Sequence, residues 1–157
     1  MSAQLAMLTP HQAQILFPKP RIGQGSFTTS VDSHTIPIQT KDVVHDTEKR
    51  IFGITGRNAD ALSNTVRTVY IQFPDDTPAG TVFHLAEGEF TNIRVWFTVD
   101  TALNKYAVRV ITGTLSIQEI STRGIHIAGA CSGRTERNPS GKSHEMVINF
   151  DLKTSYS

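Results

Sequence analysis

Apolar residues recur at every second position along most of this chain, from Val66 to Leu152. Near the end of that stretch Ile148, Phe150 and Leu152 are separated by single residues, and almost no segment has a helical period. Successive side chains of a strand point to opposite sides of a sheet, so a period of two describes strands that bury one face. The pattern predicts an all-β protein.

Clusters of turn-forming residues divide the alternating pattern into about ten short strands. Such strands without a strong helix are typical of antiparallel sheets packed face to face. We therefore expect an antiparallel β-sandwich of about 8–10 strands, forming a single domain over residues 23–157. The predicted strands are Ser26–Asp32, Thr35–Thr40, Arg50–Thr55, Thr65–Phe73, Thr81–Ala86, Ile93–Asp100, Tyr106–Ile111, Thr114–Ile120, Gly124–Cys131 and Glu145–Lys153.

Residues 1–22 differ from the rest and are interpreted as an N-terminal arm. Thr9 and Pro10 are typical of a helix start, and Pro18 ends the short helix expected after them. Leu16 and Phe17 are the apolar anchors of this arm. They either pack across the end of their own domain or dock on a neighbouring subunit, and the low content of charged residues (18%) favours a homo-oligomer.

Composition excludes several classes of partner. The net charge of +1 gives no reason to expect nucleic acid or an anionic membrane as the main partner. No apolar run approaches the ~20 residues of a membrane-spanning helix. The first twenty residues lack the order of a secretory signal, so we expect a cytoplasmic protein, with signal-independent secretion left open.

Neither a cofactor nor a metal site is predicted. The six histidines stand singly, without the short spacings of zinc sites. His84 with Glu87 and Glu89 could supply metal ligands, but solvated or core histidines are the simpler interpretation. Cys131 lies on an apolar strand face, which favours a buried small side chain over a nucleophile.

Motifs for catalysis are absent or incomplete. Gly141-Lys142-Ser143 resembles the end of a phosphate-binding loop, but Glu136 stands where the first glycine is needed and a strand pattern follows. No Gly-x-Ser-x-Gly elbow occurs. Carboxylates could still meet across strands without a sequence trace, so an enzyme is unsupported but not excluded.

Charge is unevenly distributed along the chain. The region between Thr68 and Ile93 has no Lys or Arg and contains four acids, Asp75, Asp76, Glu87 and Glu89. The stretch between Thr122 and His144 is basic. It could bind an acidic partner or the acidic region of a second copy, or both regions could be ordinary solvated loops. The candidate binding residues there are Arg123, Arg134, Arg137 and Lys142.

Trp96 and Arg94 are a second pair of candidate binding residues. Trp96 falls on the polar side of its strand, where an exposed aromatic side chain would favour ligand or protein contacts. The alternative is that Tyr70, Tyr106 and Arg109 cover it within the same sheet.

Glycines punctuate three strands in a similar way. Ile54-Thr55-Gly56, Ile111-Thr112-Gly113 and Ile127-Ala128-Gly129 echo one another, and glycine within a strand often marks a bulge or a close backbone approach. We interpret them as bends of a sheet. With the Gly80-to-Phe83 segment, this order resembles small bacterial β-sandwich domains of unknown function. Those relatives often carry lipoprotein signals that this chain lacks, and the resemblance implies a fold and no activity.

The leading functional hypothesis is a non-enzymatic β-sandwich that works by binding or self-association, because edge strands offer unpaired backbone groups. The first alternative is a carbohydrate- or lipid-binding module that uses Trp96. The second is an immunity-type partner that neutralises a toxin through the basic stretch.

Overall fold

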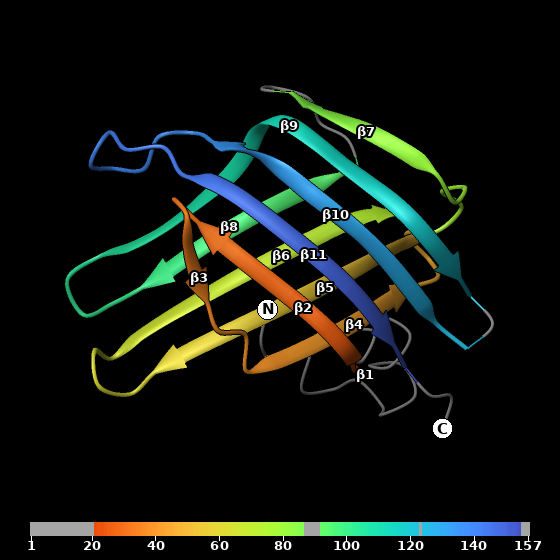
Figure 1. Cartoon of the computed structure of the whole chain (residues 1–157), viewed down its shortest axis with the longest axis horizontal. Coiled ribbons are helices and arrows are strands. Elements are labelled where there is room, and N and C mark those ends of the chain that lie inside the picture. The colour runs from red at the N-terminus through yellow and green to blue at the C-terminus, as the bar shows by residue number, and fades with distance from the viewer. Residues whose placement is uncertain (1–20, 87–91, 123, 155–157) are drawn as a thin grey trace, which may run out of the picture.

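Eleven antiparallel strands make up the computed structural model of this chain, which describes residues 21–86, 92–122 and 124–154 (Figure 1). No helix occurs within these ranges, so the all-β prediction is confirmed. The strands are β1 (Arg21–Ile22), β2 (Gln24–Val31), β3 (His34–Ile36), β4 (Thr40–Asp46), β5 (Ile51–Asp60), β6 (Thr65–Pro74), β7 (Thr81–Ala86), β8 (Arg94–Asp100), β9 (Lys105–Ser121), β10 (His126–Thr135) and β11 (Glu145–Lys153).

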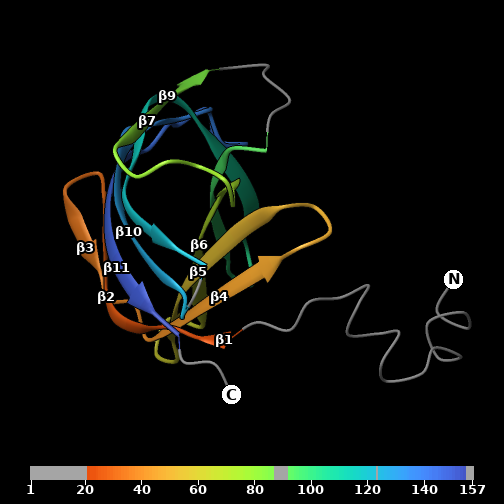
Figure 2. The same cartoon turned by 90° about the vertical axis from the view of Figure 1, so that its right-hand side faces the viewer.

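All of these strands belong to one sheet, in the order β1-β4-β5-β6-β8-β9-β10-β11-β2-β3, and β7 also pairs with β9. The sheet curls so that its two halves face each other (Figure 2). We call β4, β5, β6, β8 and the first half of β9 the first wall. The second half of β9, with β10, β11, β2 and β3, is the second wall.

β9 is the strand that joins the two walls. Its residues 105–109 pair with β8, whereas residues 112–117 pair with β7 on the same edge. Gly113 lies at the change of partner, with φ at 116°, and a Cβ there would collide with the backbone of Ser132 and Gly133 in β10. Only glycine adopts this conformation readily, so the bend of the sheet depends on it.

Gly23 connects β1, a terminal strand of the sheet, to β2 on the opposite wall. The Gly23 amide donates to the carbonyl of Lys41 (2.7 Å), and the Lys41 ammonium donates to the carbonyl of Gly25 (2.7 Å). Further along, a Cβ on Gly56 would come within 2.7 Å of the Phe27 ring. Gly56, the glycine of Ile54-Thr55-Gly56, therefore allows a close approach of the two walls, whereas the sequence interpretation had taken it as a bend of the sheet.

The core fills the space between the walls. Every second residue of the long strands points inward, as the alternation predicted, and several of these side chains are fully buried. The first wall contributes Phe52, Ile54, Ile71 and Phe73, and the second contributes Leu115, Ile117, Ile127, Ile148 and Leu152.

The sandwich prediction is wrong, because the two walls are continuous through β9 rather than separate sheets. The sequence interpretation had divided β9 into two strands at Gly113. It also missed β4 and ended a predicted strand at Thr55, although β5 continues to Asp60. The predicted arm over residues 1–22, with its helix and its anchors Leu16 and Phe17, lies outside the described residues except for its last two positions.

Candidate functional site

A cleft of about 340 Å³ opens between the two walls, at the end where the β2–β3, β5–β6, β8–β9 and β10–β11 connections gather (left side of Figure 1). We call it the mouth cleft. Its volume falls within the range of small-molecule sites. The first wall supplies Arg67, Phe97, Val99 and Tyr106, and the second wall with the segment after it supplies Val31, His34, Thr35, Ile36, Pro37 and His144.

Three side chains form a hydrogen-bonded chain at the wall of the mouth cleft. The Nδ1 atom of His144 lies 2.8 Å from the Oδ2 atom of Asp32, and its Nε2 atom lies 2.9 Å from the hydroxyl of Tyr106. Asp32 comes from the β2–β3 turn, Tyr106 from β9 and His144 from the residue before β11. Antiparallel pairing of β2 with β11 brings the first and last together.

His144 is held rigidly. Its backbone amide donates to the hydroxyl of Thr135 (2.9 Å), and its carbonyl accepts from the Thr135 amide (2.8 Å). Its ring meets the Phe97 ring edge-on, with centroids 5.5 Å apart. The residue is 8% exposed. Such a ring cannot turn over without breaking the packing around it.

Asp32 is fixed by the backbone as well as by His144. Its Oδ1 atom accepts from the Glu145 amide (2.9 Å). Desolvation by itself would raise the pKa of Asp32. The hydrogen bonds from His144 and Glu145, with the charges of His144 and Lys142, outweigh that effect and lower the pKa below 3.8. Asp32 is therefore a carboxylate at neutral pH and acts only as a hydrogen-bond acceptor.

Arg67 faces the same cleft from the opposite side. On the inner face Arg67 pairs with Val99, and Val99 pairs with Tyr106. The backbones of Arg67 and Tyr106 are thus two strand spacings, about 10 Å, apart. Val99 is short and forms the floor between two long side chains.

Trp96 and Arg94 lie on the outer face of the first wall, away from the mouth cleft. Trp96 is half-buried in a row between Tyr70 and Arg109, so two of its three expected neighbours are confirmed. Tyr106 is not one of them, because it points inward. The pKa of Tyr70 is raised, mainly by burial, with Asp46 adding to the shift and Arg94 opposing it.

The structure separates the predicted basic residues from Trp96 and disperses them. Arg134 lies on β10, where its guanidinium contacts Glu145 (3.5 Å) and donates to Ser143 (3.1 Å). Arg137 and Lys142 are exposed in the β10–β11 loop. Lys142 lies close enough to contribute to the lowered pKa of Asp32. Arg123, Glu87 and Glu89 lie outside the described residues.

Cys131 is 1% exposed, and burial raises the pKa of its thiol to about 12. The interpretation as a buried small side chain is confirmed, since a nucleophilic cysteine needs access and thiolate character. Within the described part of the chain no cluster of three His, Cys, Asp or Glu side chains could hold a metal ion. His126 contacts Glu119 and Asp151, but through opposite ring nitrogens.

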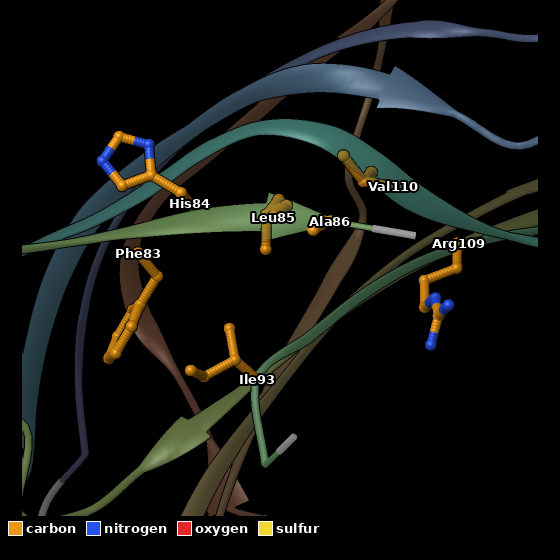
Figure 3. Close-up of a pocket in the computed structure, with 7 residues that line it drawn as sticks. All are labelled: Phe83, His84, Leu85, Ala86, Ile93, Arg109 and Val110. Atoms are coloured by element: carbon orange, nitrogen blue, oxygen red, sulfur yellow. The ribbon is translucent and has the colours of Figure 1, made fainter. Parts of the chain in front are cut away.

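A second, smaller cavity of about 220 Å³ lies where β7 and β8 diverge from β9 (Figure 3). Phe83, Leu85 and Ile93 turn toward one another there, while His84 points to the other side of β7. Arg109 supplies the charged group of this lining. We call this space the fork cavity. It is smaller than most ligand sites and brings together fewer polar groups than the mouth cleft does.

Sequence reasoning missed all the polar residues of the mouth cleft except Tyr106, which it assigned to the wrong face. A signal was present. Arg67 lies two positions before Val69, so the alternation places both on the same face of the strand. The same holds for Tyr106 with Val108 and for His144 with Met146. Three polar residues at inward positions near strand ends indicate a polar mouth. Asp32 belongs to a turn and has no such signal.

No protein-family model, curated protein or solved structure matches this chain. The resemblance to small bacterial β-sandwich domains therefore stays a hypothesis. Among the described residues there is no helix of the length and apolar character that crossing a membrane requires.

Proposed function

We propose that this protein binds a small organic anion in the mouth cleft. The observation that carries the proposal is Arg67, a half-buried guanidinium in a cleft whose other walls are largely apolar. A guanidinium donates hydrogen bonds and accepts none, and its planar fork matches a carboxylate or phosphate.

Arg67 has no hydrogen bond or ion pair with a described residue. The charge of Arg67 acts weakly on Asp60: the pKa of Asp60 is lowered first by hydrogen bonds from Ser63 and Leu62, and last by Arg67. Removing a charge from water without a close partner costs free energy. An anionic ligand would supply that partner.

The rest of the lining suits the carbon skeleton of such a ligand. Ile36, Pro37, Phe97 and Val99 offer apolar surface on both sides of the cleft, and each buried CH₂ contributes about 0.8 kcal/mol. Val99 and Phe97 belong to a buried strand and are 9% and 2% exposed. A preformed rigid floor lowers the conformational cost of binding.

Benzoate and its neutral counterpart benzamide are suitable probes, because they differ in charge and hardly in shape. In isothermal titration calorimetry we expect benzoate to bind and benzamide to bind more weakly. Arg67→Gln is expected to weaken benzoate by about tenfold or more, since hydrogen bonds to charged groups contribute about 1.5–3 kcal/mol.

Arg57→Gln is the matched control, because Arg57 is exposed on the neighbouring strand β5 and faces the other side of the sheet. Its affinity for benzoate should equal that of the unmodified protein. Equal binding by the Arg67→Gln variant, or no binding of benzoate at millimolar concentration, would contradict the proposal.

Self-association, part of the leading sequence hypothesis, stays a prediction. The terminal strands of the sheet, β1 and β3, have two and three residues, which is too short for extensive edge pairing. β7 has six residues and pairs with β9 along one edge, so pairing between copies would rest on that strand.

A further inference from the structure

The direction of the Asp32–His144–Tyr106 hydrogen bonds determines what Tyr106 offers to a ligand. Asp32 is ionised and accepts on both oxygens, one bond coming from Glu145 and the other from His144. The Nδ1 atom of His144 therefore carries a proton. If the ring carries that single proton, the Nε2 atom has the lone pair and accepts the hydroxyl proton of Tyr106, whereas a ring with both protons would donate to the Tyr106 oxygen.

With His144 singly protonated, Tyr106 has no proton left for the cleft. Its oxygen sits 2.9 Å from His144, and both residues line the mouth cleft. What remains available on that oxygen is lone-pair density, which accepts hydrogen bonds. Packing of His144 against Phe97 and its reciprocal bonds to Thr135 keep the ring in the orientation that maintains this arrangement.

The mouth cleft thus has opposite hydrogen-bonding character at its two sides. Arg67 only donates, and Tyr106, whose backbone lies about 10 Å from that of Arg67, offers an acceptor. A ligand that satisfies both must have an anionic group at one end and a donor at the other. A hydroxyl can fill the second position, because it donates to Tyr106 without adding a second charge to the ligand.

We infer that the ligand of the mouth cleft is a hydroxycarboxylic acid, with its carboxylate on Arg67 and its hydroxyl donating to Tyr106. This inference rests on the proposed function, since it requires that an anion occupies the cleft. It adds the second recognition element and makes Tyr106 a specificity-determining residue.

Three probes separate the two elements: 4-hydroxybenzoate, benzoate and 4-methoxybenzoate. All three share the carboxylate and the ring. At the opposite end, 4-hydroxybenzoate presents a donor, benzoate presents no polar group, and 4-methoxybenzoate presents an acceptor. We expect calorimetry to find 4-hydroxybenzoate about tenfold tighter than benzoate, because benzoate leaves the Tyr106 oxygen without a donor. 4-Methoxybenzoate should bind most weakly, because its ether oxygen and the Tyr106 oxygen are both acceptors. In Tyr106→Phe the preference for the hydroxyl should disappear while benzoate affinity is kept.

The outcomes distinguish the inference from the proposed function. If all three probes bind equally and Arg67→Gln weakens all of them, the anion site stands and the hydroxyl element is wrong. If none binds, both are wrong. Preference for 4-methoxybenzoate would also overturn the inference, because it would mean that Tyr106 donates to the cleft.

A measurement on the unmodified, ligand-free protein tests the direction of the His144–Tyr106 hydrogen bond without requiring that a variant folds. The ¹⁵N chemical shifts of His144 report which ring nitrogen carries the proton. We expect Nδ1 to be protonated and Nε2 to have the lone pair. The opposite tautomer, or protons on both ring nitrogens, would overturn the inference, because Tyr106 would then accept from His144 and turn its own proton toward the cleft.

Discussion

At the scale of single residues, Asp32 organises the wall of the mouth cleft. Its two oxygens bind the side chain of His144 and the backbone of Glu145, and its own amide donates to the Glu145 carbonyl (2.8 Å). One turn residue therefore joins β2 to the start of β11 and fixes the tautomer of His144. Its φ of 51° is left-handed, a conformation that Asp and Asn tolerate better than most residues.

The pKa of Asp32 is lower in the folded protein than 3.8, so its ionised form stabilises the fold. That contribution is complete above the unfolded value and is lost as the pH falls through the folded value. We expect Asp32→Asn to lower the free energy of unfolding by about 1 kcal/mol at pH 7, and the difference to shrink below pH 3.8. Urea unfolding followed by Trp96 fluorescence at several pH values measures it.

Asp76 provides the comparison for this pH dependence, since it is exposed and has no hydrogen bond to a described residue. Asp76→Asn should change stability little at any pH. A stability difference for Asp32→Asn that stays constant between pH 7 and pH 3 would show that the carboxylate charge is not what stabilises the turn.

At the scale of elements, the bend of β9 decides the architecture. The strand serves both walls, and its pairing with β10 shifts register between Ala128 and Gly129 and again between Arg134 and Thr135. Such irregularities increase the local twist and bend a strand. Because β9 bends at Gly113, β7 and β8 can pair with different parts of the same edge.

Gly113→Ala tests that role. We expect a loss of about 1–3 kcal/mol or more in the free energy of unfolding, because alanine must adopt a φ of 116° and its Cβ meets the backbone of β10. Gly80→Ala is the control: its φ is 89°, but nothing lies within 4 Å of the added Cβ. Denaturant titration should find Gly113→Ala clearly less stable than Gly80→Ala, and equal values would mean that the contact with β10 does not matter.

At the scale of the whole molecule, stability depends on how closely the two walls approach. The Phe27 ring lies over Gly56 of the opposite wall and packs near Phe150, with ring centroids 6.4 Å apart. Phe27 is 6% exposed, so it has little room to move. The same curl leaves the mouth cleft open at one end of the core.

Gly56→Ala should therefore cost about 1–3 kcal/mol in the free energy of unfolding, the usual penalty for overpacking a rigid interior. Gly23→Ala is the matched control, because its Cβ would make ordinary contacts of 3.4 and 3.5 Å with Leu152 and Val43. We expect that variant to be nearly neutral. Thermal unfolding measures both, and a Gly56→Ala variant as stable as Gly23→Ala would contradict close packing of the walls.

Much of the local structure could be predicted from the sequence. Alternation placed β7 and β11 at their observed bounds and identified the buried faces of β6 and β8. It failed at β4, where Lys41, Asp42, His45 and Asp46 obscure the period of two. Pairing with β1 and β5 makes that segment a strand, and such pairing is not a local property.

The candidate site was less accessible to sequence reasoning. Tyr106 and His144 are 38 positions apart, and Asp32 and His144 are 112 apart. The alternation on their own strands indicates inward positions for Tyr106 and His144, although Tyr106 was interpreted as facing outward. No spacing rule connects residues on strands that become neighbours only after the sheet has curled. Trp96 and Arg94 lie on the outer face, where the alternation had placed them, and away from the mouth cleft.

By itself, the sequence determined that this protein is built from strands with one buried face, because the side-chain period of two follows from local backbone geometry. It also identified Gly113 as a bend of the sheet. Only the tertiary structure decided that the walls form one sheet and that Asp32, Tyr106, His144 and Arg67 meet at its mouth. Strand order and curvature arise from pairing between distant segments, and that pairing leaves no trace in any short stretch of the chain.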